Sequence, residues 1–471
     1  MVFNSLIFIF MFLPLVFLAY TLIPNRMIKT AVLILCSLLF YSWGQPASLV
    51  LMLVTIVWNY LTGLELALYE GNKRKYIFWI GVLFHVLILV IYKYTNFILG
   101  FTSIHIDLAL PVGLSFFTFS AISYLADVYM GKSEPQKNLL SLALYLSFFG
   151  KVSMGPIVQY HDMEKDLSCF KKIRVLEFGE AFQRIMKGLA KKVIIADQLS
   201  LMYASLSGNT TSLGTWLCAI AYMLQIYFDF SGYSDMAIGI SRLFGFAFDE
   251  NFDHPYTAVS VQDFWRKWHI SLSRWFRDYI YIPLGGNRVP DNIYIRNILI
   301  VWLLTGIWHG ASMNFIVWGL YYGLLLLAER FIWKDKLKRL PRFIQHLYTL
   351  LLVLIGWVFF YSSSLVSAFK TILAMLGIGA TGFSDMHALF ALRQNFVLIV
   401  IAILFSMPLF DRIDKAILHV MKQRGVILSI CFWFVLFVIS LAFIVGNTFQ
   451  SFLYFAFYEY NGWASPSNTV K

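Results

Sequence analysis

The stretch ILIVWLLTGIWHGASMNFIVWGLYYGLLLLA, residues 298–328, holds one group that can carry charge near neutral pH, the imidazole of His309. As a single helix its 31 residues would measure about 46 Å, whereas the hydrocarbon core of a bilayer is about 30 Å thick. We therefore predict a membrane segment that breaks into two helices. Four small or polar residues mark the place of the break: Gly306, Gly310, Ser312 and Asn314.

The same apolar character extends over most of the chain. Of its 471 residues, 59% are hydrophobic and only 13% are charged, and the mean hydropathy is +0.71. A soluble domain has about twice this charged fraction. We predict an all-α polytopic membrane protein with roughly ten to twelve transmembrane helices, plus re-entrant and interfacial helices, in a single membrane domain, 1–471, without a separate soluble domain. The apolar runs are 5–23, 28–43, 47–64, 76–98, 108–130, 139–160, 212–229, 298–328, 345–361, 396–410 and 426–446.

The charges and cysteines of the chain fit this class. The first apolar run lacks a basic segment before it, so we interpret it as a retained helix rather than a signal peptide. The net charge of +12 indicates cytoplasmic loops rich in Lys and Arg rather than binding to nucleic acid. No metal-ligand spacing connects the four cysteines, which are Cys36, Cys169, Cys218 and Cys431.

Basic residues give a topology for the N-terminal part. Arg26 and Lys29 lie in the first loop and Lys73–Lys75 in the third, whereas the second loop, WGQPAS, has no basic residue. The positive-inside rule places the first and third loops in the cytoplasm and the N-terminus outside. The fifth loop, GKSEPQK, and the segment 161–192 are both basic. They cannot both lie in the cytoplasm if 139–160 crosses the membrane once, so we favour a re-entrant 139–160 segment that is broken around Gly150 and Pro156.

The longest polar stretch, 247–297, is dense in aromatic and charged residues. Its apolar residues recur at spacings of three and four, which predicts an amphipathic helix at the membrane interface. The residues of this apolar face are Phe264, Trp265, Trp268, Leu272, Trp275, Phe276 and Tyr279. His254 precedes a proline in NFDHPY, and we interpret it as a turn residue.

Two histidines have both a chemical and a packing interpretation. His309 at a helix break is either functional or a neutral imidazole that hydrogen-bonds a neighbouring helix. His269 points toward the apolar face of the amphipathic helix, and on local sequence alone a half-solvated interfacial imidazole is favoured.

Other classes of site are absent from the sequence or weakly indicated. The chain has no P-loop, dinucleotide glycine motif, HExxH or GxSxG. Asp127, Asp229 and Asp235 lie in apolar context, and a transporter or flippase with an ion path through them stays open as an alternative. A transporter predicts inverted repeats, and we find no internal repeat.

Several motifs together resemble the membrane-bound O-acyltransferase family, in particular its bacterial alginate O-acetylation branch. The resemblance covers most of the chain in the same order and is most specific in WHIS…WFRDYIYIPLGG…WHG. The related D-alanyl transferases share the two histidine motifs but not IPLGGNR. The matching stretches are MGPIVQY (154–160), GLAKKVIIADQL (188–199), GYSDMAIGISRLFGF (232–246), NFDHPY (251–256), FWRKWHISLSRWFRDYIYIPLGGNR (264–288), LTGIWHGASMNFIVWG (304–319) and FLYFAF (452–457).

The resemblance implies an acyltransferase with His309 as its catalytic histidine and His269 as a second site residue that orients His309 or donates to the developing oxyanion. It implies a ring of helices around a thinned centre and an acyl thioester, acetyl-CoA or another, as the cytoplasmic donor substrate. No bound cofactor or metal is expected. The chain itself is expected in the cytoplasmic membrane of a bacterium, with the acyl acceptor on the outer side. A separate extracytoplasmic acetyltransferase partner of the SGNH type is also expected.

The resemblance also gives the C-terminal FLYFAF a second interpretation. By composition it is an aromatic belt at the membrane interface. In the family branch, a similar motif has been proposed to relay the acyl group through its tyrosine, here Tyr454. The expected overall reaction is O-acetylation of an alginate-, cellulose- or peptidoglycan-type polysaccharide. Transfer of another acyl group, such as D-alanine, or direct acylation of a lipid alcohol stays open.

Overall fold

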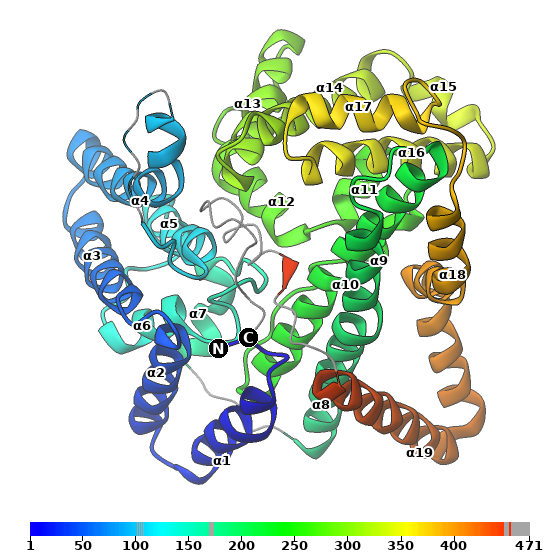
Figure 1. Ribbon diagram of the computed structural model, residues 1–471. Helices are drawn as coiled ribbons and strands as arrows, with labels where there is room; N and C mark the ends of the chain where they lie inside the picture. The colour runs from blue at the N-terminus through cyan, green and yellow to red at the C-terminus, as the bar shows by residue number, and fades with distance from the viewer. Residues whose placement is uncertain are drawn as a thin grey trace. The chain divides into compact units, whose positions relative to one another are not determined.

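The computed structural model describes residues 1–100, 102, 104, 106, 108–168, 174–446 and 452–453, and these contain helices but no strand (Figure 1). The all-α prediction is confirmed. Six described helices are long and apolar enough to cross a membrane, so the chain is a multi-pass membrane protein. Other apolar runs form shorter helices, and the predicted ten to twelve crossings stay a prediction. The six spans are Ser48–Leu68, Gly71–Leu99, Ser212–Leu243, Arg342–Tyr361, Met386–Ser406 and Leu428–Gly446.

The chain divides into two compact units, one formed by Met1–Ile185, Tyr233–Asp249 and Ile444–Lys471, and the other by Met186–Gly232 and Glu250–Phe443. The prediction of one membrane domain, 1–471, is not tested by this division. The long helix α10 (Ser212–Leu243) contributes residues to both units.

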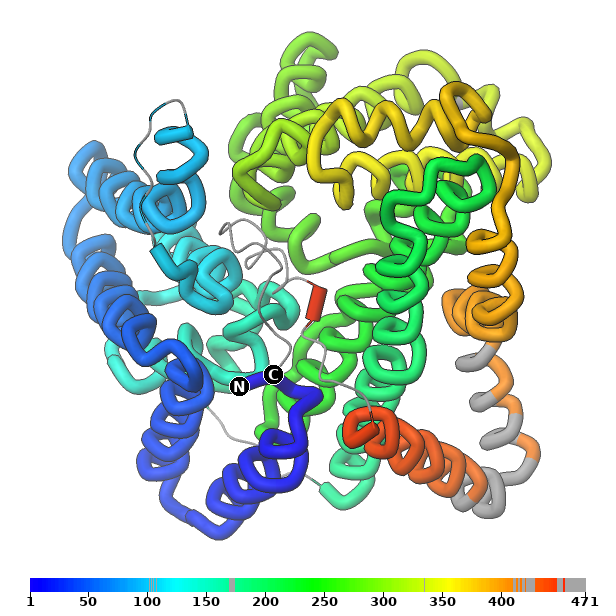
Figure 2. The backbone as a smooth tube through the Cα atoms, viewed as in Figure 1, coloured from blue at the N-terminus to red at the C-terminus, as the bar shows by residue number. Residues whose placement is uncertain are grey.

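The first unit is organised around α5, whose residues from Leu114 to Val128 are buried on every side. Burial on every side places this helix in the interior of the unit, together with its polar side chains, which include Asp127. Helix α5 packs against α3 and α4, and α6 packs against α2 and α3 (Figure 2, blue to cyan). The helices of this part of the chain are η1 (Phe8–Phe12), α1 (Leu13–Leu22), α2 (Arg26–Ser42), α3 (Ser48–Leu68), α4 (Gly71–Leu99), α5 (Leu114–Tyr129), α6 (Leu139–Ser147), α7 (Tyr160–Ser168) and most of α8 (Val175–Ala190).

The second unit is built around a hairpin of α13 and α14, with α16 packed against α14 and α11 packed against both α14 and α16. Its helices besides α10 are η2 (Lys191–Ala196), α9 (Asp197–Leu206), η3 (Pro255–Thr257), α11 (Val261–Lys267), α12 (Ile270–Phe276), η4 (Arg277–Tyr281), α13 (Asp291–His309), α14 (Met313–Phe331), α15 (Lys334–Arg339), α16 (Arg342–Tyr361), α17 (Leu365–Met375), α18 (Met386–Ser406) and most of α19 (Leu409–Gly446).

Both predicted helix breaks are present. The 298–328 stretch forms α13, which ends at His309, and α14, which begins at Met313. The 139–160 stretch forms α6, which ends at Ser147, and is followed by turns up to α7. Lys151 lies in these turns, where it is buried and donates a hydrogen bond to Ser120 Oγ at 3.0 Å. The side of the membrane on which this segment returns stays a prediction.

The single amphipathic helix predicted within 247–297 is wrong. Its sequence forms α11 and α12, because the chain bends between them: Trp268 is extended and His269 adopts the left-handed conformation (φ 46°, ψ 54°). The predicted apolar face is largely buried in the protein, since Phe264, Trp268 and Trp275 are each at most 4% exposed. Periodicity found the apolar positions but not the break between them.

Candidate active site

His309 is the last residue of α13, and the connection to α14 is only three residues long. Gly310 is extended (φ −178°). Ser312 caps the N-terminus of α14, because its side chain accepts a hydrogen bond from the backbone N–H of Asn314 at 3.3 Å. The Asn314 side-chain amide donates to the Ser362 carbonyl oxygen after α16. These bonds satisfy the start of α14, so the break next to His309 is a built feature of the fold.

Aromatic rings from three helices surround the His309 imidazole. Trp318 of α14 and Phe360 of α16 meet it edge to face, with ring centroids 4.8 and 5.1 Å away. Its sequence neighbour Trp308 lies 4.7 Å away. Rings in such arrangements restrict the orientation of an imidazole, and they keep bulk water from one side of it. His309 itself is half-buried.

The position of His309 depends on a close crossing of α13 and α14. A Cβ added at Gly306 would overlap the carbonyl oxygen of Phe315, and one added at Gly319 would overlap the carbonyl oxygen of Trp302. The two helix backbones therefore approach each other in a way that only glycine permits. This contact lies one helix turn before His309.

His269 lies in the same unit and is buried, at 3% exposure. Its ring meets Phe230 of α10 edge to face at 4.7 Å and lies 6.3 Å from the ring of Trp308. The ring of Trp308 thus contacts both histidine rings, so His269 and His309 belong to the same aromatic cluster. The half-solvated imidazole that local sequence alone favours is wrong, because the ring is buried against Phe230 of α10 and Asn251.

Burial lowers the pKa of His269 to about 3, because a charged imidazole would lose its hydration there. The ring is therefore neutral at physiological pH. Its Nδ1 is 3.1 Å from Asn251 Oδ1, and its Nε2 is buried without a hydrogen-bond partner among the described residues. A buried polar nitrogen in this situation costs about 1–3 kcal/mol unless a ligand or water engages it.

Side chains from distant elements cap the two short helices on either side of His269. Glu329 of α14 accepts the first backbone N–H groups of α11, from Val261 at 2.7 Å and Gln262 at 3.0 Å. Asn251 plays the same part for α12: its carbonyl oxygen accepts from Ile270 N and its Oδ1 from Ser271 N. Sequence reasoning missed both roles, although Asn251 stands in the NFDHPY motif. His254 of this motif is a turn residue, as predicted, with φ 44° before η3.

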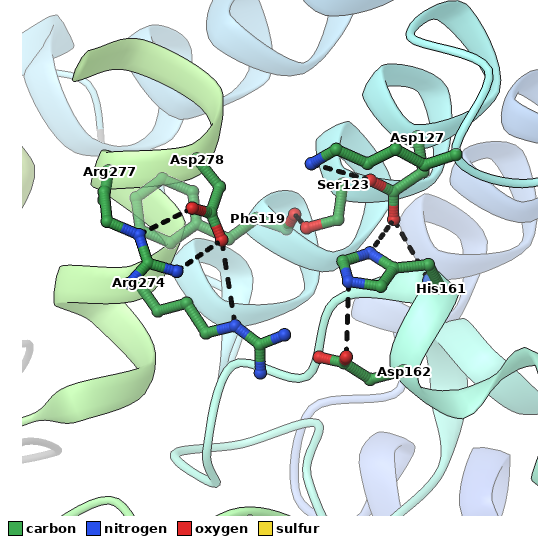
Figure 3. Close-up of polar contacts among 9 residues, drawn as sticks. Phe119, Ser123, Asp127, His161, Asp162, Arg274, Arg277 and Asp278 are labelled. Carbon is green, nitrogen blue, oxygen red and sulfur yellow. Dashed lines mark hydrogen bonds and ion pairs between the residues drawn. The ribbon is translucent and has the colours of Figure 1, made fainter. Parts of the chain in front are cut away.

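The three carboxylates considered for an ion path are each held by a cationic or hydrogen-bonding side chain of their own unit. Asp127 accepts from His161 Nδ1 and from the His161 backbone N–H, both at 3.0 Å, and Lys132 lies 3.8 Å away (Figure 3). Asp229 pairs with Lys192, and Asp235 pairs with Arg184, both at 2.6 Å. Figure 3 also includes Asp278 with Arg274 and Arg277, from the second unit.

Tyr454 lies outside the described residues, as does most of FLYFAF, although Phe452 is buried against Tyr233 at 5.0 Å in the first unit. Among the described residues no group of three or more His, Cys, Asp or Glu side chains could hold a metal ion.

Comparisons with known proteins agree with the resemblance in the sequence. A family model described as MBOAT, membrane-bound O-acyltransferase family, matches residues 58–365. The probable alginate O-acetylase of Pseudomonas aeruginosa is 38% identical over 404 residues, which cover 82% of this chain and 77% of that protein. The peptidoglycan O-acetyltransferase of Helicobacter pylori is 34% identical over 461 residues, 87% of each chain. The teichoic acid D-alanyltransferase of Bacillus subtilis is 30% identical over 246 residues, 49% of this chain and 62% of that protein.

Proposed function

The chain belongs to the membrane-bound O-acyltransferase family and is an acyltransferase, and from this premise we propose that it transfers acetyl groups for O-acetylation of an exported or cell-wall polysaccharide, with His309 as general base. The observation that carries the proposal is the half-buried imidazole of His309 at the break between α13 and α14, inside the part matched by the family model. The donor is acetyl-CoA or another acyl thioester on the cytoplasmic side of a bacterial cytoplasmic membrane.

The chemistry needs little more than a base and a fixed geometry. A thioester is already activated, so the slow step is attack by a hydroxyl oxygen on its carbonyl carbon. His309 takes the hydroxyl proton as the new C–O bond forms, and returns it to the thiolate when the C–S bond breaks. A neutral imidazole suits this exchange at neutral pH. The rings of Trp318 and Phe360 hold it in one orientation.

Acetyl is favoured over D-alanyl by the extent of the similarity. The two O-acetylating relatives align over 82% and 87% of this chain, and the D-alanyltransferase over 49%. The polysaccharide itself is selected together with a separate extracytoplasmic partner enzyme of the SGNH type. Alginate and peptidoglycan, the substrates in the relatives' names, define the class of acceptor that we propose.

The test uses the full chain in nanodiscs with radiolabelled acetyl-CoA and measures the label that passes to a polysaccharide acceptor or to the partner enzyme. We expect His309→Ala to lower the rate at least about 100-fold, which is the usual contribution of a general base. His387→Ala is the matched control, because it removes an exposed imidazole of α18. Near-normal transfer by His309→Ala would refute the assignment, and label transfer only from a D-alanyl donor would replace acetyl by D-alanyl.

A further inference from the structure

We propose that Asn251 is a positioning residue that fixes His269 in its Nδ1–H tautomer. His269 Nε2 then accepts a hydrogen bond from a hydroxyl group of the acyl acceptor other than the one that His309 deprotonates, and it does not donate to the oxyanion. This inference rests on the proposed function for its place in the reaction. Its structural part, the tautomer of a buried histidine, can be measured without any activity.

The first step is the orientation of the Asn251 amide. The backbone N–H of Ser271 points at Oδ1 of Asn251 at 3.2 Å, and the Ser271 hydroxyl lies 2.8 Å from the same atom. A backbone N–H can only donate, so the atom that it meets must be the amide oxygen and not the amide nitrogen. Since the Asn251 backbone carbonyl also accepts from Ile270 N at 2.9 Å, the residue is held at two points.

The second step is the location of the proton on His269. Its Nδ1 lies 3.1 Å from the same oxygen of Asn251, so Nδ1 must carry a hydrogen to make this contact favourable. Burial keeps the ring neutral, and a neutral imidazole has only one N–H. The remaining nitrogen, Nε2, therefore presents a lone pair. It can accept a hydrogen bond or a proton, but it cannot donate one to an oxyanion.

The third step is the state of Nε2. It is fully buried, and no hydrogen-bond partner lies within reach among the residues that the structure describes. His269 also keeps a left-handed backbone, which is strained for a residue with a side chain. Strain and an unsatisfied acceptor on the same residue are typical of a site that is completed by its substrate. A hydroxyl group is the substrate feature that supplies the missing donor.

A second buried Asn–His pair, in the first unit, shows how an asparagine amide contacts a histidine that has no role in the proposed reaction. Asn59 Nδ2 donates to the Thr55 carbonyl oxygen at 2.8 Å and lies 2.9 Å from His85 Nε2. There the amide satisfies Nε2 directly, and the histidine has nothing left to offer to a ligand at that nitrogen. In the Asn251 pair the amide is turned the other way and engages Nδ1, which leaves Nε2 for the substrate.

The experiment measures the tautomer by ¹⁵N NMR of the full chain, labelled at histidine and embedded in nanodiscs. The His269 signals are assigned by their loss in His269→Gln. We expect Nδ1 with the chemical shift of a protonated nitrogen and Nε2 with that of an unprotonated one. A protonated Nε2 in the wild type would overturn the inference, whether or not the protein is active.

Variants then connect the tautomer to the reaction. Asn251→Asp keeps an acceptor oxygen and should retain the Nδ1–H tautomer and a kcat within about tenfold of the wild type. Asn251→Leu should give mixed tautomers and lower kcat about 100-fold, with a smaller change in KM. Asn59→Leu is the matched control: it removes an equally buried Asn–His pair and should lower the melting temperature without changing kcat.

The outcomes separate this inference from the proposed function. If the wild type transfers no acetyl group while the tautomer is as expected, the proposed function fails and the placement of the proton stands. If acetyl transfer is normal in Asn251→Leu despite mixed tautomers, the positioning role of Asn251 is refuted and His309 remains the base.

Discussion

Gly306→Ala tests whether the crossing of α13 and α14 positions His309. The added Cβ would overlap the carbonyl oxygen of Phe315 and would lie 3.4 Å from the Cα of Gly319. Carbon and carbonyl oxygen approach to about 3.3 Å at helix–helix contacts, so the helices must separate by about 1 Å. Overpacking of this kind costs about 1–3 kcal/mol of stability. His309 follows one turn later, about 4.5 Å along the same helix, and moves with it.

A displacement of about 1 Å at a catalytic group lowers the rate about 100-fold. The assay is acetyl transfer in nanodiscs, with kcat and melting temperature measured on the same preparations. Gly179→Ala, in α8, is the control, since a Cβ there has no neighbour within 4 Å, and it should stabilise the protein by about 1 kcal/mol. If Gly306→Ala keeps kcat within about threefold of the wild type, the close crossing does not position His309, and the reasoning is refuted.

Three further predictions concern other parts of the chain. Single cysteines introduced near Arg26 and Lys73 should be protected from an impermeant reagent in intact cells, and labelling of either from outside would overturn the predicted topology. Tyr454→Phe should abolish polysaccharide acetylation if the tyrosine relays the acyl group, whereas full activity would leave FLYFAF as an interfacial anchor. The hydrogen bond to Asp127 raises the pKa of His161, so its stabilisation is complete below the unfolded pKa of about 6.5 and is lost as pH rises through the folded pKa. The melting temperature of His161→Gln should accordingly lie furthest below that of the wild type near pH 6, and a difference that does not change up to about pH 9 would contradict this.

The sequence predicted the helices well where local physics decides them. An apolar run must be helical in a membrane because its backbone groups have no other partners, and this holds for α3, α4 and α16. The break after His309 was also predictable, because the run is too long for one crossing and Ser312 can cap a new helix. Both inferences use only neighbouring residues.

The parts that could not be predicted depend on residues far apart in the chain. The amphipathic pattern across α11 and α12 is real, but the helix breaks at His269 because Asn251, 18 residues earlier, binds the N-terminus of α12. Glu329 binds the N-terminus of α11 from 68 residues away. Periodicity carries no information about such contacts. His309 was found from its isolation in an uncharged stretch, whereas Asn251 is one of many polar residues in a polar segment.

The carboxylates in apolar context bear on the choice between acyl transfer and ion transport. A charge inside a membrane protein is expensive unless it is paired, and an ion path needs carboxylates that can exchange their partners. Each of the three has a partner at short distance in its own unit: Asp127 has His161, Asp229 has Lys192, and Asp235 has Arg184. Pairs of this kind connect α5 to α7 and anchor α10, so the stability of the helix packing accounts for all three. Acyl transfer needs none of them at the reacting atoms, because a neutral imidazole is a sufficient base for a hydroxyl nucleophile. We propose His309 as that base and His269 as the accepting nitrogen, and the rings of both residues contact Trp308.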